Sequence, residues 1–269
     1  MKKKLCILSI SLIIILSVIF SLNTEVTIKQ GINRKVSTIK IPLYLKILDF
    51  FDRHYNYKLL VNRILQNSKT EKEKIVKLFE WTHSHIKKMP EGFPVVDDHV
   101  WHIIVRGYGA RDQSQDVFTT LCSYAGANAF FDRVYERNQV FSMPLSLVKL
   151  NNAWRVFDTY NGVYFVNSSG EIATINEIKK GDWQLKKITQ SSMTAVDYEA
   201  YLANLPSIKE VDYQRANIQS PLKRLIYEIR KWMTPDKVKV KIFSHIYVSY
   251  TELKLAVTSP DKIIYKIFV

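Results

Sequence analysis

The most prominent feature of the chain is an uninterrupted apolar stretch near its N-terminus. It runs from Leu5 to Leu22 without a charged residue and follows three lysines at positions 2–4. A helix over this stretch is about 27 Å long, close to the thickness of the hydrocarbon layer of a membrane. The stretch is longer than the apolar part of an ordinary signal peptide, and no A-x-A-like cleavage pattern follows it. It therefore predicts a membrane anchor or uncleaved signal over residues 1–22, with a cleaved signal peptide as the alternative.

Helical spacing of apolar residues dominates the next part of the chain. Residues 23–40 are polar and β-tolerant, which favours a linker or an edge strand. Beyond Pro42, apolar residues recur every three or four positions, which predicts a helix, and a second helical stretch covers residues 57–66. Ser68 with Glu71 three residues later is typical of a helix start, and the helix it opens has an apolar face through residue 86.

The spacing of apolar residues changes after residue 126 from one typical of helices to one typical of strands. Four short runs, 129–135, 142–150, 154–158 and 163–166, have the composition of strands and are separated by turn signals such as Asn151-Asn152. Helices followed by a series of strands predict an α+β fold with an antiparallel sheet.

Two motifs stand out in this α+β region. The first is Arg106–Gln113, a glycine turn followed by Asp-Gln, a helix over residues 117–124 and Gly126. The second is the series Val148, Leu150, Trp154 and Asp158. In order and spacing, both resemble motifs of the transglutaminase-like superfamily of papain-like thiol enzymes, in which the second motif surrounds the base and the orienting acid. The resemblance implies a papain-like core over residues 70–180, preceded by a linker and helical lead-in at 23–69 and followed by a basic C-terminal extension at 181–269.

The catalytic positions of the family are altered in this sequence. Ala110 matches the nucleophilic cysteine, Met143 matches the histidine base, and only the orienting acid is kept, as Asp158. Loss of nucleophile and base removes the thiol mechanism. The resemblance therefore implies a catalytically inactive domain, which acts as a binding or scaffolding module in cell-envelope or exported-polysaccharide processes.

Several residues keep other interpretations open. Asp112, Gln113, Trp154 and Asp158 are candidates for a polar binding pocket, although Asp112 also suits a helix N-terminus and Trp154 suits a core. The alternative function is a hydrolase or transferase with a non-cysteine mechanism, using Asp112, Asp158 or the His/Asp cluster at 97–102. No cofactor and no metal site is expected.

The cysteines and histidines give little support for a catalytic nucleophile or a metal site. Cys122 falls in the middle of a helix, where a buried structural thiol is expected, and Ser114 has no base placed beside it. His99 and His102 could share a helical face, but His83 and His85 could not, and histidines at surfaces or turns are far commoner than ligands.

The net charge of the chain limits the classes of partner that it is expected to bind. The chain has 39 Lys and Arg against 25 Asp and Glu. The three N-terminal lysines predict that the anchor leaves the main domain outside the cytoplasm, as a single-pass membrane protein. The exported part then has 36 basic and 25 acidic residues, a net charge of +11. The expected partners are the membrane, through residues 5–22, and cell-envelope proteins or anionic polymers, with no nucleic acid. The helix at 222–232, with one apolar and one basic face, either packs on its own domain or lies on an anionic membrane surface.

Overall fold

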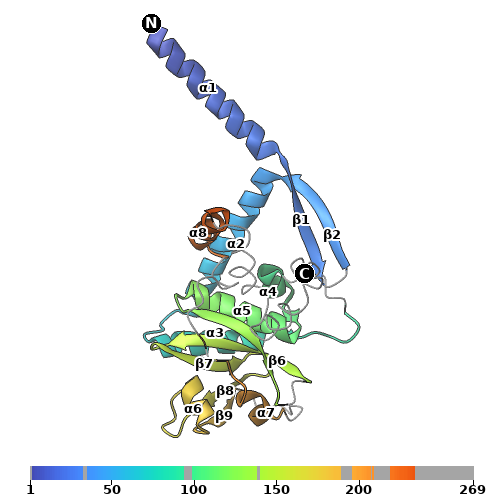
Figure 1. Ribbon diagram of the computed structural model, residues 1–269, viewed down its shortest axis with the longest axis vertical. Coiled ribbons are helices and arrows are strands. Elements are labelled where there is room, and N and C mark those ends of the chain that lie inside the picture. Colours follow the sequence, from blue (N-terminus) through green and yellow to red (C-terminus); the bar gives the residue numbers. More distant parts are fainter. Residues whose placement is uncertain are drawn as a thin grey trace.

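The computed structural model describes residues 2–32, 35–93, 99–137, 140–188, 196–206, 208 and 219–233. It contains a long N-terminal helix, a hairpin, a layer of helices and a five-stranded sheet (Figure 1). The α+β order of helices followed by an antiparallel sheet is confirmed.

The N-terminal helix α1 (Lys2–Asn23) projects from the rest of the chain (Figure 1). Its segment Cys6–Asn23 has a mean hydropathy of 2.5 and none of it is buried in the protein. Within the described residues it is the one helix long and apolar enough to cross a membrane, as a signal sequence or a single anchor would be. The hairpin of β1 (Glu25–Ile32) and β2 (Lys35–Pro42) occupies the segment expected as a linker or an edge strand.

The helical layer comes next. The helix expected after Pro42 is confirmed, but it is a single element, α2 (Leu43–Ile64), where the apolar spacing suggested two. The cap expected at Ser68 is wrong by two residues. Thr70 is the N-cap of α3 (Glu71–His85), because its hydroxyl accepts the Glu73 N–H while the Glu73 carboxylate accepts the Thr70 N–H.

Two short elements lead the chain into the central helix. The mixed segment before the glycine turn contains α4 (Val100–Arg106), which ends at Gly107 in the left-handed conformation. β3 (Lys87–Lys88) and β4 (Tyr108–Gly109) then pair in parallel. The central helix α5 (Arg111–Tyr124) follows directly and is buried from Gln113 to Cys122.

The sheet has the order β5–β6–β7–β8–β9 with every neighbour antiparallel. Asn151 and Asn152 both have positive φ, as a two-residue hairpin turn between β6 and β7 requires. The last strand and α7 lie beyond residue 180, where the sequence places the end of the core. The bounds of the elements are β5 (Ala129–Tyr135), β6 (Ser142–Leu150), β7 (Ala153–Asp158), β8 (Val163–Val166), α6 (Ile175–Lys179), β9 (Gln184–Lys187) and α7 (Tyr198–Leu202).

Both faces of the sheet are covered, which explains why Met143–Val148 in β6 is buried without interruption. One hydrophobic cluster joins α2, α3, α4 and α5 to the sheet, with Phe79, Phe118 and Phe157 in mutual ring contact. The second cluster lies on the other face and includes α6 and α7. The amphipathic helix expected near the C-terminus is confirmed as α8 (Pro221–Met233), which packs beside α2.

Candidate functional site

The N-terminus of α5 is built by the glycine turn that precedes it. A Cβ atom at Gly109 would lie 3.1 Å from the side chain of Gln113, a closer approach than most Cβ atoms make, so a larger residue here would press on Gln113. The Gln113 Oε1 accepts hydrogen bonds from the Ala110 N–H and from the Arg106 guanidinium, at 3.0 and 2.8 Å. Ala110 is the N-cap residue and is half-buried. A methyl group thus occupies the position from which a side chain would meet the positive end of the helix dipole.

Asp158, at the end of β7, is fully buried and surrounded by donors. Its Oδ1 accepts from the Gln115 side-chain amide at 3.0 Å and from the Asn161 N–H at 3.2 Å. Its Oδ2 accepts from the Asn161 amide at 2.7 Å and from the Tyr198 hydroxyl at 2.9 Å. Burial, followed by the charge of Asp158, raises the pKa of the Tyr198 hydroxyl, which keeps it a donor. The carboxylate is therefore held by four hydrogen bonds from within the protein.

Gln115 connects this carboxylate to the sheet. Its Oε1 accepts from the Ser146 hydroxyl at 2.6 Å and from the Thr159 hydroxyl at 2.8 Å, while its amide donates to Asp158. Ser114, one residue earlier on α5, donates to the Thr159 hydroxyl at 3.2 Å and is fully buried. The start of α5 and the end of β7 are thus joined side by side through a buried polar network.

Met143 has a different environment. It is 1% exposed and belongs to the hydrophobic cluster on the face of the sheet opposite α5, together with Leu145 and Val156. Trp154 lies on the same face, edge-on to Phe130, and is four residues, about 13 Å, from Asp158 along β7. The structure therefore brings Gln113, Asp112 and Asp158 to neighbouring parts of α5 and β7 but leaves Trp154 at the other end of its strand.

Asp112 lies in the first turn of α5, half-buried, and its Oδ1 accepts from the Gln113 N–H at 3.0 Å. Next to it, Arg111 lies over the ring of Tyr160 at 5.2 Å, and Lys88 lies over the same ring at 5.1 Å. The first turn of α5 thus lies beside two cationic side chains and an aromatic ring.

The histidines do not gather into a ligand set. His99 is the N-cap of α4, and its ring lies 5.0 Å from that of His102. Asp97 and Asp98, the acidic members of the expected His/Asp cluster, lie outside the described residues. No group of three or more histidine, cysteine or acidic residues that could hold a metal is found in the described part of the chain.

His83 is a member of the site that the sequence analysis considered only as a metal ligand and set aside. Its Nδ1 is 2.9 Å from the Thr159 carbonyl oxygen, directly after Asp158. Gly162 makes room for the imidazole, since a Cβ atom there would lie 2.6 Å from the His83 Nε2. Gln115 was missed. Its signal is the run of polar residues Gln113–Asp116 directly before the apolar pair Val117-Phe118, in the part of α5 that is buried.

Cys122 lies on α5, far from the Ala110 end, and is fully buried. Burial raises the pKa of its thiol well above the usual range, which makes it a poor nucleophile.

Comparisons with known proteins give distant structural similarities. No family profile matches the chain, and no curated protein matches it. A candidate cysteine protease from Cytophaga hutchinsonii is similar over 54% of this chain and 56% of its own, with 12% identity and a TM-score of 0.35. A candidate protease from Parabacteroides distasonis is similar over 49% of this chain and 35% of its own, with 12% identity and a TM-score of 0.33. A transglutaminase is similar over 49% of this chain and 43% of its own, with 10% identity and a TM-score of 0.33. The chain thus spans little more than half the length, or less, of each of these proteins.

Proposed function

We propose that the chain is a membrane-tethered domain of the transglutaminase-like type that has lost thiol catalysis and acts as a binding or scaffolding module outside the cytoplasmic membrane. The observation that carries the proposal is that α5 has Ala110 as its N-cap residue and is bonded, through Gln115, to an Asp158 carboxylate held by the protein's own donors. In a thiol enzyme the first position needs a thiolate and the carboxylate orients an imidazole.

The chemistry of the three positions supports inactivity. A methyl group at Ala110 cannot form a covalent intermediate. The thioether of Met143 cannot take up a proton near neutral pH, and it lies on the face of the sheet opposite α5. The Asp158 carboxylate accepts hydrogen bonds from Gln115, Asn161 and Tyr198, and so joins α5, β7 and α7. Its lone pairs are then engaged in structure and not in orienting a catalytic base. On this proposal the former catalytic centre has become a structural joint, and the half-buried Asp112 in the first turn of α5, next to Arg111 and Tyr160, is the place for a bound partner.

The location supports the choice of partner. If α1 is an anchor, the lysines at its N-terminal end keep that end in the cytoplasm, and the rest of the chain faces the cell envelope. The exported part carries +11, so acidic envelope polymers and proteins with acidic surfaces are the expected ligands. Alkaline phosphatase fused after residue 233 would be active on this topology and inactive on the reverse one.

The central experiment places a thiol at each end of α5. The variants Ala110→Cys and Ala125→Cys change the N-cap and the C-cap of the same helix, and both alanines are half-buried. The N-terminal thiol should have a lowered pKa and react with iodoacetamide at about pH 6, whereas the C-terminal thiol should not. Equal rates at the two sites would contradict the assignment of Ala110 to a nucleophile position.

Inactivity is tested on the native chain. Peptide hydrolysis and transfer of a glutamine acyl group to an amine should both be absent, and binding of a purified anionic envelope polysaccharide should be measurable and fall with salt. Turnover by the native chain that survives purification and disappears in Asp158→Asn would overturn the proposal in favour of a hydrolase or transferase without a cysteine.

A further inference from the structure

The surface formed by α2 and α8 is far more apolar than the rest of the described body. On α8 the side chains at i, i+3, i+4, i+7, i+10 and i+11 form one face, and all are exposed: Leu222, Leu225, Ile226, Ile229, Trp232 and Met233. On α2 a second exposed row runs through Leu48, Phe51, Tyr55 and Leu59. Contiguous exposed apolar surfaces of this kind mark interaction sites in soluble and membrane-bound proteins. We call this surface the α2–α8 face.

The orientation of α8 is opposite to that of an ordinary surface helix. Tyr227 is its buried residue, with 4% exposure, and it lies on the side away from the apolar row. Trp232, on the apolar row, is 84% exposed. In a helix that packs on its own domain the apolar row turns inward. Here it turns outward, and within the described part of the chain nothing covers it.

The α2–α8 face lies in the part of the body nearest to α1. The Leu43 N–H at the start of α2 donates to the Thr24 carbonyl just after α1, at 2.9 Å, and the two helices are in contact. Figure 1 shows α8 alongside α2, at the end of the body from which α1 projects, whereas α6 and β9 lie at the far end. An anchored α1 would therefore hold this face close to the surface of the bilayer.

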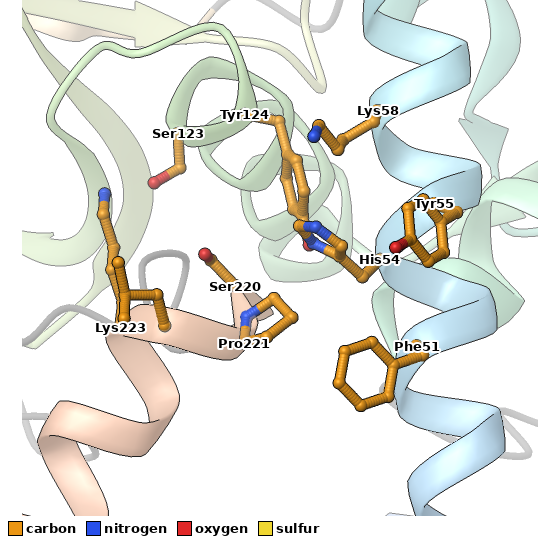
Figure 2. Close-up of a pocket in the computed structure, with 10 residues that line it drawn as sticks. Phe51, His54, Tyr55, Lys58, Ser123, Tyr124, Ser220, Pro221 and Lys223 are labelled. Atoms are coloured by element: carbon orange, nitrogen blue, oxygen red, sulfur yellow. The ribbon is translucent and has the colours of Figure 1, made fainter.

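A pocket with a volume of about 470 Å³ opens between the two helices and the C-terminal end of α5 (Figure 2). Lys58 of α2 and Lys223 of α8 line it, together with the hydroxyls of Ser123 and Ser220, and none of its lining residues is acidic. Burial lowers the pKa of the Lys223 ammonium, so an anion in the pocket would stabilise its charged form. Phe51 and Tyr55 continue the wall of the pocket into the exposed row of α2. The pocket thus has basic side chains in its lining and an apolar rim.

We propose that the α2–α8 face binds the anionic phospholipids of the membrane that holds α1, with the lipid phosphate in the Lys58–Lys223 pocket and the apolar row of α8 among the acyl chains. An amphipathic helix with an apolar face that ends in tryptophan, and with basic residues on its flanks, is suited to this position. The affinity of one short helix is small, but the tether keeps it at a high effective concentration at the surface. The contact would hold the site at the start of α5 in a fixed orientation toward the cell envelope.

The proposal rests on the anchor in the proposed function, and its test does not involve the Ala110 region. The full chain with Cys6→Ser is placed in nanodiscs of phosphatidylcholine with or without phosphatidylglycerol. A fluorophore is attached through Ile229→Cys on α8 or, as a control, through Gln184→Cys on exposed β9. The native Cys122 is fully buried and is not labelled. Nitroxide-bearing lipids should quench the fluorophore at position 229, more strongly in the anionic discs, and leave that at position 184 unquenched.

Charge reversal gives the second measurement. Lys58→Glu with Lys223→Glu should remove more than half of the quenching at position 229. Lys179→Glu with Lys180→Glu makes the same change of net charge at exposed residues of α6 and should have no effect. Quenching at position 229 no greater than at 184 would overturn the proposal. Equal quenching in discs with and without anionic lipid would also overturn it. A fluorophore at position 229 that is shielded from aqueous iodide but is not quenched by the nitroxide lipids would overturn it as well, because it would indicate that protein covers the face.

Discussion

Replacement of Gln115 by alanine is the most informative perturbation of the site. The side chain makes its hydrogen bonds entirely inside the protein, to Asp158, Ser146 and Thr159. Gln115→Ala removes the amide donor from a buried carboxylate and the acceptor from two hydroxyls. Thr159 still accepts from Ser114, but its hydroxyl and its N–H lose the Gln115 acceptor, and so does the fully buried Ser146 hydroxyl.

The magnitude follows from these losses. A hydrogen bond to a charged group contributes about 1.5–3 kcal/mol, and a buried polar group left without a partner costs about 1–3 kcal/mol. The expected loss is on the order of 4 kcal/mol, a large part of the roughly 5–15 kcal/mol by which a domain is stable. With a urea dependence of about 2 kcal/mol/M, the unfolding midpoint should fall by about 2 M.

The assay is urea unfolding of the full chain in detergent, followed by circular dichroism. Gln184→Ala on β9 is the control, because it deletes the same amide from an exposed position, and its free energy of unfolding should stay within about 0.5 kcal/mol of the native value. A Gln115→Ala variant as stable as this control would refute the view that the buried network joins α5 to β7.

Three further outcomes are expected from single sites. Thr70→Ala should cost α3 about 1 kcal/mol of unfolding free energy, measured by urea denaturation, since it removes the N-cap hydroxyl. The Thr174 N–H, with Asn167 and the Thr174 hydroxyl, lowers the pKa of Glu177 to about 2. A lowered folded pKa contributes stability above the unfolded value, so the native advantage over Glu177→Gln should shrink as pH falls from about 4.5 to about 2, as thermal melts at several pH values would show. In a Cys6→Ser background, Cys122 should react with Ellman's reagent only after unfolding, because burial raises the pKa of its thiol.

Local signals in the sequence were enough to predict most of the elements. The strands around Asn151-Asn152 were found because that pair favours the left-handed backbone, and both residues adopt it. The start of α3 was placed two residues early because Ser68-Glu71 and Thr70-Glu73 have the same spacing. Local sequence cannot choose between two equal capping boxes when packing of the helix decides.

The site was only partly predictable, because its bonds cross long distances in the chain. Gln115 and Asp158 are 43 residues apart, and Tyr198 is 40 residues beyond Asp158. The family resemblance pointed to Asp158, but it gave no reason to expect these donors. His83 was likewise hidden, since its contact with Thr159 depends on the docking of α3 against the end of β7.

The two ends of α5 have different surroundings. The proposal for the Ala110 region and the proposal for the α2–α8 face can therefore be tested independently. The first turns of α5 carry Ser114 and Gln115, which bond to the end of β7. At its last turn, the Tyr124 hydroxyl donates to the Gln219 carbonyl just before α8, and its oxygen lies 2.9 Å from the His54 Nδ1. Tyr124 is nine to ten residues beyond Gln115 and Ser114, which puts these regions about 14–15 Å apart along the helix. Tyr124→Phe should therefore reduce lipid quenching at position 229 by loosening α8, and it should leave the reactivity of a thiol introduced at position 110 unchanged. If Tyr124→Phe altered both, α5 would transmit changes between the membrane face and the site, and the two proposals could no longer be treated as independent.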